Sequence, residues 1–156
     1  MNNSEINDNL AKRISESALL CVKHDDKVNV MTVSWGGFGV LWGKEVCFVF
    51  VRPSRFTYGF CEAEDKFTLS FFKSNRRDTL SYCGRKSGRD TDKIKDCKLS
   101  FSNDDGFIVF DDAEITLKLR KLYSDDIKRE CFNDSRPLTN YKDGDFHRMY
   151  VCEVCR

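Results

Sequence analysis

Residues 52–57 carry the strongest chemical signal in the sequence. They follow the continuous apolar run 46–51, which is typical of a buried strand. Ser54 is a good N-cap, so a helix is expected to follow over 55–63. Free backbone N–H groups and the helix dipole favour an anion at such a start, and hydroxyl and guanidinium donors suit phosphate oxygens. The segment therefore favours a phosphate site, and the alternative is a capped helix with two solvated arginines. The donors in question are Arg52, Ser54, Arg55 and Thr57.

A second candidate lies on the predicted strand 28–35. Thr32 and Ser34 share one face of this strand, and Val33 and Trp35 share the other. A core strand does not need hydroxyls, although a solvent-facing strand would also explain them. The glycine-rich segment 35–43 that follows permits close backbone approach and favours a flat ligand here. Its spacing lacks the third glycine of a dinucleotide fingerprint and the Ser or Thr of a phosphate-binding P-loop.

Two further features are ambiguous by themselves. The segment 82–93 is basic and interrupted by glycine, so it is either a solvated loop or one that closes over an anion. His147 is one of two histidines, and a lone histidine is more often structural than catalytic. No Ser-His-Asp or Cys-His arrangement is apparent.

The eight cysteines are read as reduced thiols in the cytoplasm. Most stand singly in apolar segments, as small buried hydrophobic residues do. Cys152 and Cys155 form the one C-x-x-C, but a structural zinc site needs a second pair of ligands. On a strand the two thiols would point to opposite faces. A metal or redox-sensing protein is therefore the weakest interpretation, and no metal site is assigned.

Composition excludes several classes of protein. The 156 residues, 40% of them hydrophobic, suit one globular domain, here taken as 1–156 with a barrel core over about 17–154. With 26 basic and 25 acidic residues the formal net charge is +1, so no nucleic-acid partner is expected. No apolar run reaches membrane-spanning length, and the first residues do not resemble a secretory signal.

The periodicity predicts mostly strands. They are placed over 17–23, 28–35, 46–51, 66–72, 107–110, 114–123 and 147–154. Helices are expected over 7–16, 55–63, 75–83 (with Gly84 as the stop) and, as a short turn, 91–96. Turns are expected at 24–27 and 143–145. The helices are too few and too short for a regular βαβ series, so the pattern predicts a mostly antiparallel barrel with short peripheral helices.

Four segments in this order resemble the flavin reductase-like, FMN-binding split-barrel proteins, most closely the flavoredoxin type. The resemblance covers about 19–154. The segments are 29–35 (N-x-M-T-x-S-W), 51–57 (V-R-P-S-R-F-T), 82–93 (Y-C-G-x-x-S-G-R-D-x-D-K) and 146–154 with its histidine.

The resemblance implies a split β-barrel that forms a homodimer and binds FMN non-covalently near the subunit interface. It also implies a flavin-dependent oxidoreductase that takes electrons from a donor, NADH or NADPH, and passes them to an acceptor. A binding module that only carries electrons or stores FMN would need the same residues, and the sequence does not separate the two.

The same resemblance assigns roles to single residues. Phosphate-binding residues would be Arg52, Ser54, Arg55 and Thr57, with Val51 in the same motif. Residues along the flavin ring would be Thr32, Val33, Ser34 and Trp35. Ser87 and Lys93 would belong to the loop that closes the site, and His147 would lie near the flavin or the incoming donor as the one candidate catalytic residue. Departures from the family pattern are Phe56 for tyrosine, Glu45 for proline and Cys152 for glycine.

Overall fold

The computed structural model describes residues 10–156. Residues 10–15 are helical, and the first part of the predicted helix 7–16 lies outside the described residues. Leu10 and Ile14, four residues apart on this helix, are buried against the barrel core.

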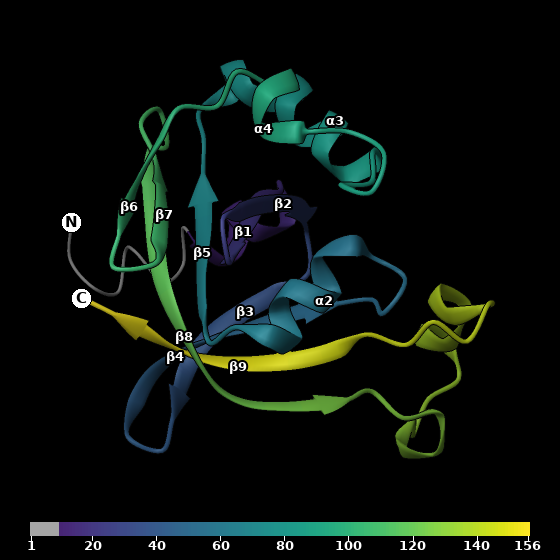
Figure 1. The fold of residues 1–156 in the computed structure, drawn as a ribbon. Coiled ribbons are helices and arrows are strands. Elements are labelled where there is room, and N and C mark those ends of the chain that lie inside the picture. Colours follow the sequence, from purple (N-terminus) through teal and green to yellow (C-terminus); the bar gives the residue numbers. More distant parts are fainter. Residues whose placement is uncertain (1–9) are drawn as a thin grey trace.

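Seven strands form one sheet in which every pairing is antiparallel, in the order β2-β1-β5-β8-β9-β4-β3 (Figure 1). Its strands are β1 (Ala18–His24), β2 (Lys27–Val33), β3 (Gly36–Leu41), β4 (Lys44–Val51), β5 (Lys66–Phe71), β8 (Ile115–Asp126) and β9 (Arg148–Cys155). A second, two-stranded sheet pairs β6 (Phe101–Asp104) with β7 (Phe107–Phe110). The mostly β, antiparallel architecture predicted from the sequence is confirmed.

Strand β1 is apolar on both faces because it separates two cores. Leu20 and Val22 belong to the larger core inside the curved sheet, where Phe67 and Tyr150 meet edge to face. Leu19 and Cys21 point the other way, into a smaller core beneath the helices. Side chains alternate along a strand, so burial of both faces requires a continuous apolar run.

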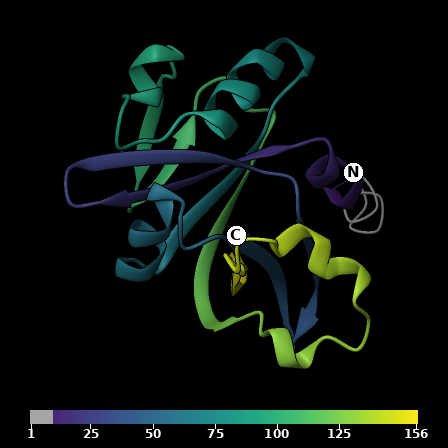
Figure 2. The ribbon, with the colours of Figure 1, turned by 90° about the vertical axis from the view of Figure 1, so that its right-hand side faces the viewer.

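Three short helices lie outside the sheet, as expected: α2 (Phe56–Ala63), α3 (Arg77–Arg85) and α4 (Lys93–Asp96). Figure 2 shows α3 and α4 together at one end of the molecule. Two details of the prediction were wrong. Gly84 lies inside α3, where an added Cβ would lie 3.4 Å from the side chain of Thr32, and Lys86 is the C-cap residue. Arg55, not Ser54, is the N-cap residue of α2, and it makes no side-chain capping bond.

Several elements were not predicted. Strand β3 falls in the glycine-rich segment, where a Cβ at Gly36 would lie 2.7 Å from the carbonyl oxygen of Phe48 on β4. Strand β6 is exposed throughout and so carries no alternation of buried residues. Short 3₁₀ helices at Arg129–Cys131 and Arg136–Tyr141 lie in the connection between β8 and β9. The turn expected at 143–145 is present, with Gly144 at φ 69°.

Candidate functional site

Two adjoining hollows contain almost all of the residues singled out from the sequence. The first, of about 330 Å³, lies at the end of β2 and is called the strand-end hollow. It is lined by Met31, Thr32, Val33, Ser34, Trp35, Phe50, Arg52, Arg55 and His147. The second, of about 200 Å³, is called the basic hollow. It is lined by Ser54, Arg55, Phe56, Thr57, Arg85, Lys86, Ser87, Gly88, Arg89 and Lys93. Arg55 belongs to both walls.

In the strand-end hollow, main-chain groups are freer to hydrogen-bond a ligand than the hydroxyls, which already have partners. Thr32 donates its hydroxyl to the carbonyl of Leu80 at 2.5 Å, and the Ser34 and Ser17 hydroxyls lie 3.0 Å apart. Within residues 10–156, strand β2 is at the edge of the sheet and pairs only with β1, so its outer N–H and C=O groups have no partner in the described sheet. An edge strand of this kind can hydrogen-bond the polar rim of a flat ring.

Aromatic side chains also line this hollow. The Trp35 ring is half exposed, and its centroid lies 5.3 Å from that of His147. Phe50 meets His147 edge to face at 6.3 Å. The side chain of Val33 is buried in the larger core. A planar apolar ligand would lie against these rings with its polar edge toward β2.

His147 is a buried, neutral imidazole. Its Nδ1 lies 2.8 Å from the Tyr141 hydroxyl, and the residue is 8% exposed. Burial, together with the nearby Arg52 guanidinium, lowers its pKa to about 4. At neutral pH it can hold a hydrogen bond, but it is not a charged acid.

Arg52 was predicted to bind phosphate together with Ser54, Arg55 and Thr57. It lines the strand-end hollow, however, and not the basic hollow that those three residues line. Its guanidinium donates to the carbonyls of Asn140 and Asp145, each at 2.9 Å. It also lies 5.0 Å from the centroid of the Tyr141 ring. Arg52 therefore ties β4 to the segment that carries Tyr141 and His147.

The basic hollow brings five cationic side chains to one wall with no carboxylate among its lining residues: Arg55, Arg85, Lys86, Arg89 and Lys93. Arg55 donates to the carbonyls of Cys83 and Gly84, and Lys93 donates to those of Cys83 and Lys86. Both cations thus sit at the negative end of α3. Lys93 is only 3% exposed, and burial lowers its pKa to about 8.

A buried lysine and a half-buried arginine whose hydrogen-bond partners in the described chain are carbonyls fit a phosphate. Their charge is not neutralised by a carboxylate, and their desolvation raises the free energy of the charged form. A dianionic group in the hollow would offset that cost. The donor set, which is rich in guanidinium and ammonium groups, is the chemistry that phosphate oxygens accept from.

The remaining predicted residues occupy different positions. Ser54 donates both its N–H and its hydroxyl to the carboxylate of Asp145. Thr57 accepts a 2.7 Å bond from the Asn29 amide, and its own hydroxyl proton stays available. Ser87 accepts from the N–H of Arg89 at 3.2 Å. Val51 is buried in the core and lines neither hollow.

Some site residues had no specific signal in the sequence. Arg85, Lys86 and Arg89 belong to the basic segment already noted, but nothing distinguished them from solvated cations. Phe50 resembles any other residue of an apolar strand. Asp145 lies in a predicted turn, and only the fold shows that it faces Ser54.

No metal site is found within residues 10–156, where no three His, Cys, Asp or Glu side chains lie together. Cys152 is buried in the core and Cys155 is partly exposed, and all eight cysteines are free thiols. In the same part of the chain, no helix combines the length and apolar character needed to cross a membrane.

Comparison with solved structures identifies the fold. An FMN-binding protein from Thermus thermophilus matches at 22% identity with a TM-score of 0.69, over 90% of this chain and 69% of its own. Flavoredoxin from Methanosarcina acetivorans matches at 18% identity and TM-score 0.69, over 90% and 66%. An NADH:FAD oxidoreductase from Streptomyces globisporus matches at 12% identity and TM-score 0.67, over 90% and 72%. These likenesses confirm the split-barrel fold.

A search of curated proteins by sequence found no match. A family model for the flavin reductase like domain matches residues 14–156, which is nearly the whole chain and includes both hollows. The resemblance inferred from four short segments is thereby confirmed, and this chain belongs to the flavin reductase like domain family.

Proposed function

We propose that this protein binds FMN and acts as a flavin-dependent oxidoreductase that takes electrons from a reduced donor, NADH or NADPH, and delivers them to an acceptor. The observation that carries the proposal is the basic hollow, which holds five cations and no carboxylate and opens beside an aromatic, strand-edged hollow. Family membership and a fold shared with FMN-binding proteins support it.

The flavin ring would lie in the strand-end hollow. The unpaired edge at the end of β2 and the main chain of 34–35 would donate to and accept from its polar rim, while Trp35 and Phe50 would cover apolar parts of the ring. Bound FMN would supply the redox chemistry, taking up hydride from the donor and releasing electrons to the acceptor. The protein's own task is to orient the ring and exclude water from it.

The phosphate would be held in the basic hollow. Arg55, Lys93 and the hydroxyl of Thr57 line it and can donate to phosphate oxygens. Arg55 also lines the strand-end hollow, so it would contact the chain that joins ring and phosphate. Ser54 would contribute only by exchanging its bonds to Asp145 for bonds to the phosphate.

His147 would position the ring or the incoming donor. Its Nδ1 faces the Tyr141 hydroxyl; if that hydroxyl donates, the proton of the neutral imidazole is on Nε2. With a pKa near 4 it holds this hydrogen bond at neutral pH and does not deliver a proton. Flavin chemistry requires no protein nucleophile, which agrees with the absence of a catalytic triad in the sequence.

Binding to a phosphate-bearing and a phosphate-free flavin tests the site directly. The dissociation constants of FMN and riboflavin are measured for the wild type and for Lys93→Met. We expect FMN to bind more tightly, and Lys93→Met to weaken FMN binding by roughly 10- to 100-fold, since a charge-assisted bond contributes about 1.5–3 kcal/mol. Riboflavin binding should not change. Equal affinity of the wild type for both flavins would reject the phosphate site.

Reduction of the bound flavin distinguishes an oxidoreductase from a protein that only carries electrons or stores FMN. The FMN-loaded protein is mixed anaerobically with NADH or NADPH, and loss of visible flavin absorbance is followed. Reduction by either donor supports the oxidoreductase. Tight FMN binding without reduction by any donor, or without transfer to added acceptors, would indicate an electron carrier or an FMN store.

We also propose a homodimer and a cytoplasmic location. Exposed Val40, Trp42, Leu122 and Tyr123 lie on β3, β8 and the turn after β3, and the Trp42 and Tyr123 rings are in edge contact. Exposed apolar groups of this kind mark surfaces that associate. Eight free thiols agree with a reducing compartment.

A further inference from the structure

The thiols of Cys83 on α3 and Cys97, the C-cap residue of α4, face each other where the two helices meet. Their sulfur atoms are 3.9 Å apart. Cys83 is buried in the smaller core, and Cys97 packs against that core while remaining partly exposed. A second contact joins the same helices, because the Tyr82 hydroxyl donates to the Asp96 carboxylate at 2.6 Å. The residues just before the two cysteines are thus also in contact, which supports the pairing of the two thiols.

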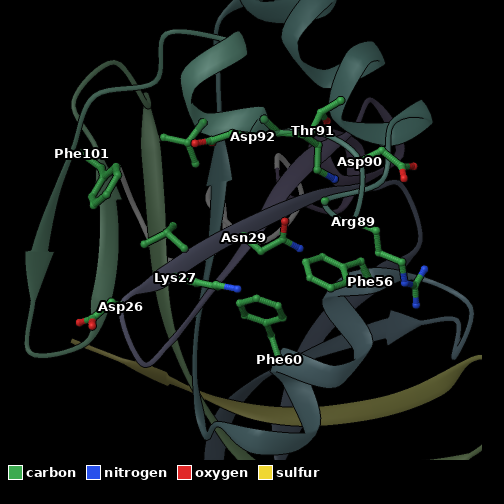
Figure 3. A pocket seen from close by; sticks show the side chains of 14 residues that line it. Asp26, Lys27, Asn29, Phe56, Phe60, Arg89, Asp90, Thr91, Asp92 and Phe101 are labelled. Carbon is green, nitrogen blue, oxygen red and sulfur yellow. The ribbon is translucent and has the colours of Figure 1, made fainter.

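The two cysteines stand at the ends of the segment that forms much of the basic hollow. This segment, 84–96, supplies more than half of the residues that line the hollow: Arg85, Lys86, Ser87, Gly88, Arg89 and Lys93. Figure 3 shows its later part, in which Arg89, Asp90, Thr91 and Asp92 lead toward α4. A covalent bond between Cys83 and Cys97 would therefore close the base of the loop that is proposed to hold the phosphate.

The main chain of the cysteine pair is bonded directly to cations of the basic hollow. The carbonyl of Cys83 accepts from the Lys93 ammonium at 3.2 Å and from the Arg55 guanidinium at 3.4 Å. The N–H of Cys97 donates to the carbonyl of Lys93 at 3.1 Å. Lys93 is thus hydrogen-bonded to both cysteines, so a change in the geometry of the pair reaches this cation without an intermediary.

The two thiols differ in their access to an oxidant. The side chain of Cys83 is fully buried, and burial, with Cys97 beside it, raises the pKa of its thiol to about 12. Cys97 is partly exposed, so an oxidant reaches this thiol first. A disulfide S–S bond is about 2.0 Å long, so the two sulfurs must approach by about 1.9 Å. Because α4 is only about one turn long, a small shift of this helix against α3 can bring them together.

We propose that Cys83 and Cys97 form a reversible disulfide that strengthens FMN binding, an inference that rests on the proposed function. Hydrogen peroxide oxidises the Cys97 thiol to a sulfenic acid, and one water is released. The Cys83 sulfur then attacks the sulfenic sulfur and forms the S–S bond, while the displaced hydroxide takes the Cys83 proton and leaves as a second water. Two thiols and one peroxide thus give one disulfide and two waters, with two electrons passing to the peroxide. A dithiol reductant reverses the change by thiol–disulfide exchange.

The bridge acts by restricting the segment that carries the phosphate-binding cations. It closes 84–96 into a covalent ring, so these residues lose less conformational freedom when a phosphate orders them, and FMN binds more tightly. In a reducing compartment such a bond is transient, as is usual for redox-sensing cysteines. The affinity for FMN would therefore rise under oxidising conditions and return when the thiols are reduced.

Peptide mapping tests the bridge without any flavin. The full-length apoprotein is treated with hydrogen peroxide, and its unreduced tryptic peptides are identified by mass spectrometry. We expect a cross-link that joins peptide 78–85 to peptide 96–98, that disappears on addition of dithiothreitol, and that neither Cys83→Ser nor Cys97→Ser forms. Cys131→Ser removes an exposed thiol that lines neither the strand-end nor the basic hollow. It is the matched control and should form the cross-link as the wild type does.

Flavin affinity then tests the effect of the bridge. The dissociation constants of FMN and riboflavin are measured for the reduced and the oxidised protein, after the peroxide has been removed. We expect the bridge to tighten FMN binding by about three- to tenfold, because the loop is ordered in advance, and to leave riboflavin binding unchanged. Cys97→Ser should bind FMN equally before and after peroxide, whereas Cys131→Ser should respond like the wild type. Because Cys97 is the less buried of the two, its replacement should leave the fold intact, as circular dichroism would verify.

The two measurements distinguish the ways in which the inference can fail. Absence of the cross-link from the oxidised wild type would overturn it, and so would a bridged protein that binds FMN no more tightly than the reduced one. An equal response of Cys97→Ser and the wild type to peroxide would also overturn it, since the effect would then arise elsewhere. Failure of FMN to bind either form would reject the proposed function, and the inference with it, whatever the peptide map shows.

Discussion

The carboxylate of Asp145 accepts hydrogen bonds from both the N–H and the hydroxyl of Ser54, although the two residues are 91 positions apart. This acid therefore occupies the donors that the sequence assigned to a phosphate. The Asp145 carbonyl also accepts from Arg52, so one residue engages two of the four expected phosphate donors.

Asp145→Asn should bind FMN more tightly than the wild type. The substitution removes a negative charge beside the basic hollow and weakens the competition for Ser54, which we expect to improve FMN affinity by about two- to tenfold. Riboflavin affinity should stay constant, because riboflavin carries no phosphate. Weaker FMN binding in this variant would show that Asp145 supports the site instead of competing for it.

FMN affinity should fall as the pH rises above about 8. Burial lowers the pKa of Lys93 to about 8, so the apoprotein loses this positive charge there. Binding of FMN and riboflavin is measured from pH 7 to 9.5, and only FMN should weaken. Lys93→Met should show a flatter dependence, and a wild-type profile as flat as the variant's would contradict this assignment.

Lys93 should also affect the stability of the apoprotein in alkali. Its pKa is lower in the folded state than in the unfolded state, so between pH 8 and 10.5 the unfolded chain binds more protons and the free energy of unfolding rises with pH. Buried cysteines with raised pKa values act in the opposite direction. The difference between wild type and Lys93→Met, measured by urea denaturation, isolates the lysine and should increase over this interval.

Acid should destabilise the protein partly through His147. Its pKa is about 4 when folded and about 6.5 when unfolded, so the unfolded chain binds more protons between these values. The free energy of unfolding should fall as the pH drops from 6.5 to 4, and His147→Gln should show a smaller fall. The same variant should leave FMN reduction without any new pH dependence between pH 6 and 8, since the imidazole is neutral there.

The two tryptophans provide a spectroscopic test of where the ring lies. Trp35 lines the strand-end hollow, whereas Trp42 lies in the turn between β3 and β4 beside Tyr123. FMN should quench the emission of Trp42→Phe strongly, because Trp35 remains, and quench that of Trp35→Phe less. Equal quenching of the two variants would place the flavin elsewhere.

The residue pattern was sufficient for the strands that border the larger core and for the helices that follow them. It was weakest where burial does not alternate. Strand β6 is exposed on both faces, and β3 is rich in glycine, so neither shows the period of two that predicts a strand. Gly84 resembled a helix stop, yet it lies inside α3 and faces Thr32 of β2, a neighbour that is distant in the sequence.

By itself, the order of residue types determined the class of fold and the family. It also located the basic segment 52–57 after a buried strand, because these features depend on local periodicity and on short motifs. Only the tertiary structure decided which charges meet. The contact of Arg52 with Asp145, that of Lys93 with the carbonyl end of α3, and the two adjoining hollows all depend on distant parts of the chain or on how a loop folds back on a helix. Local sequence does not encode such distances, since they follow from how the sheet curves and how its connections pack across it.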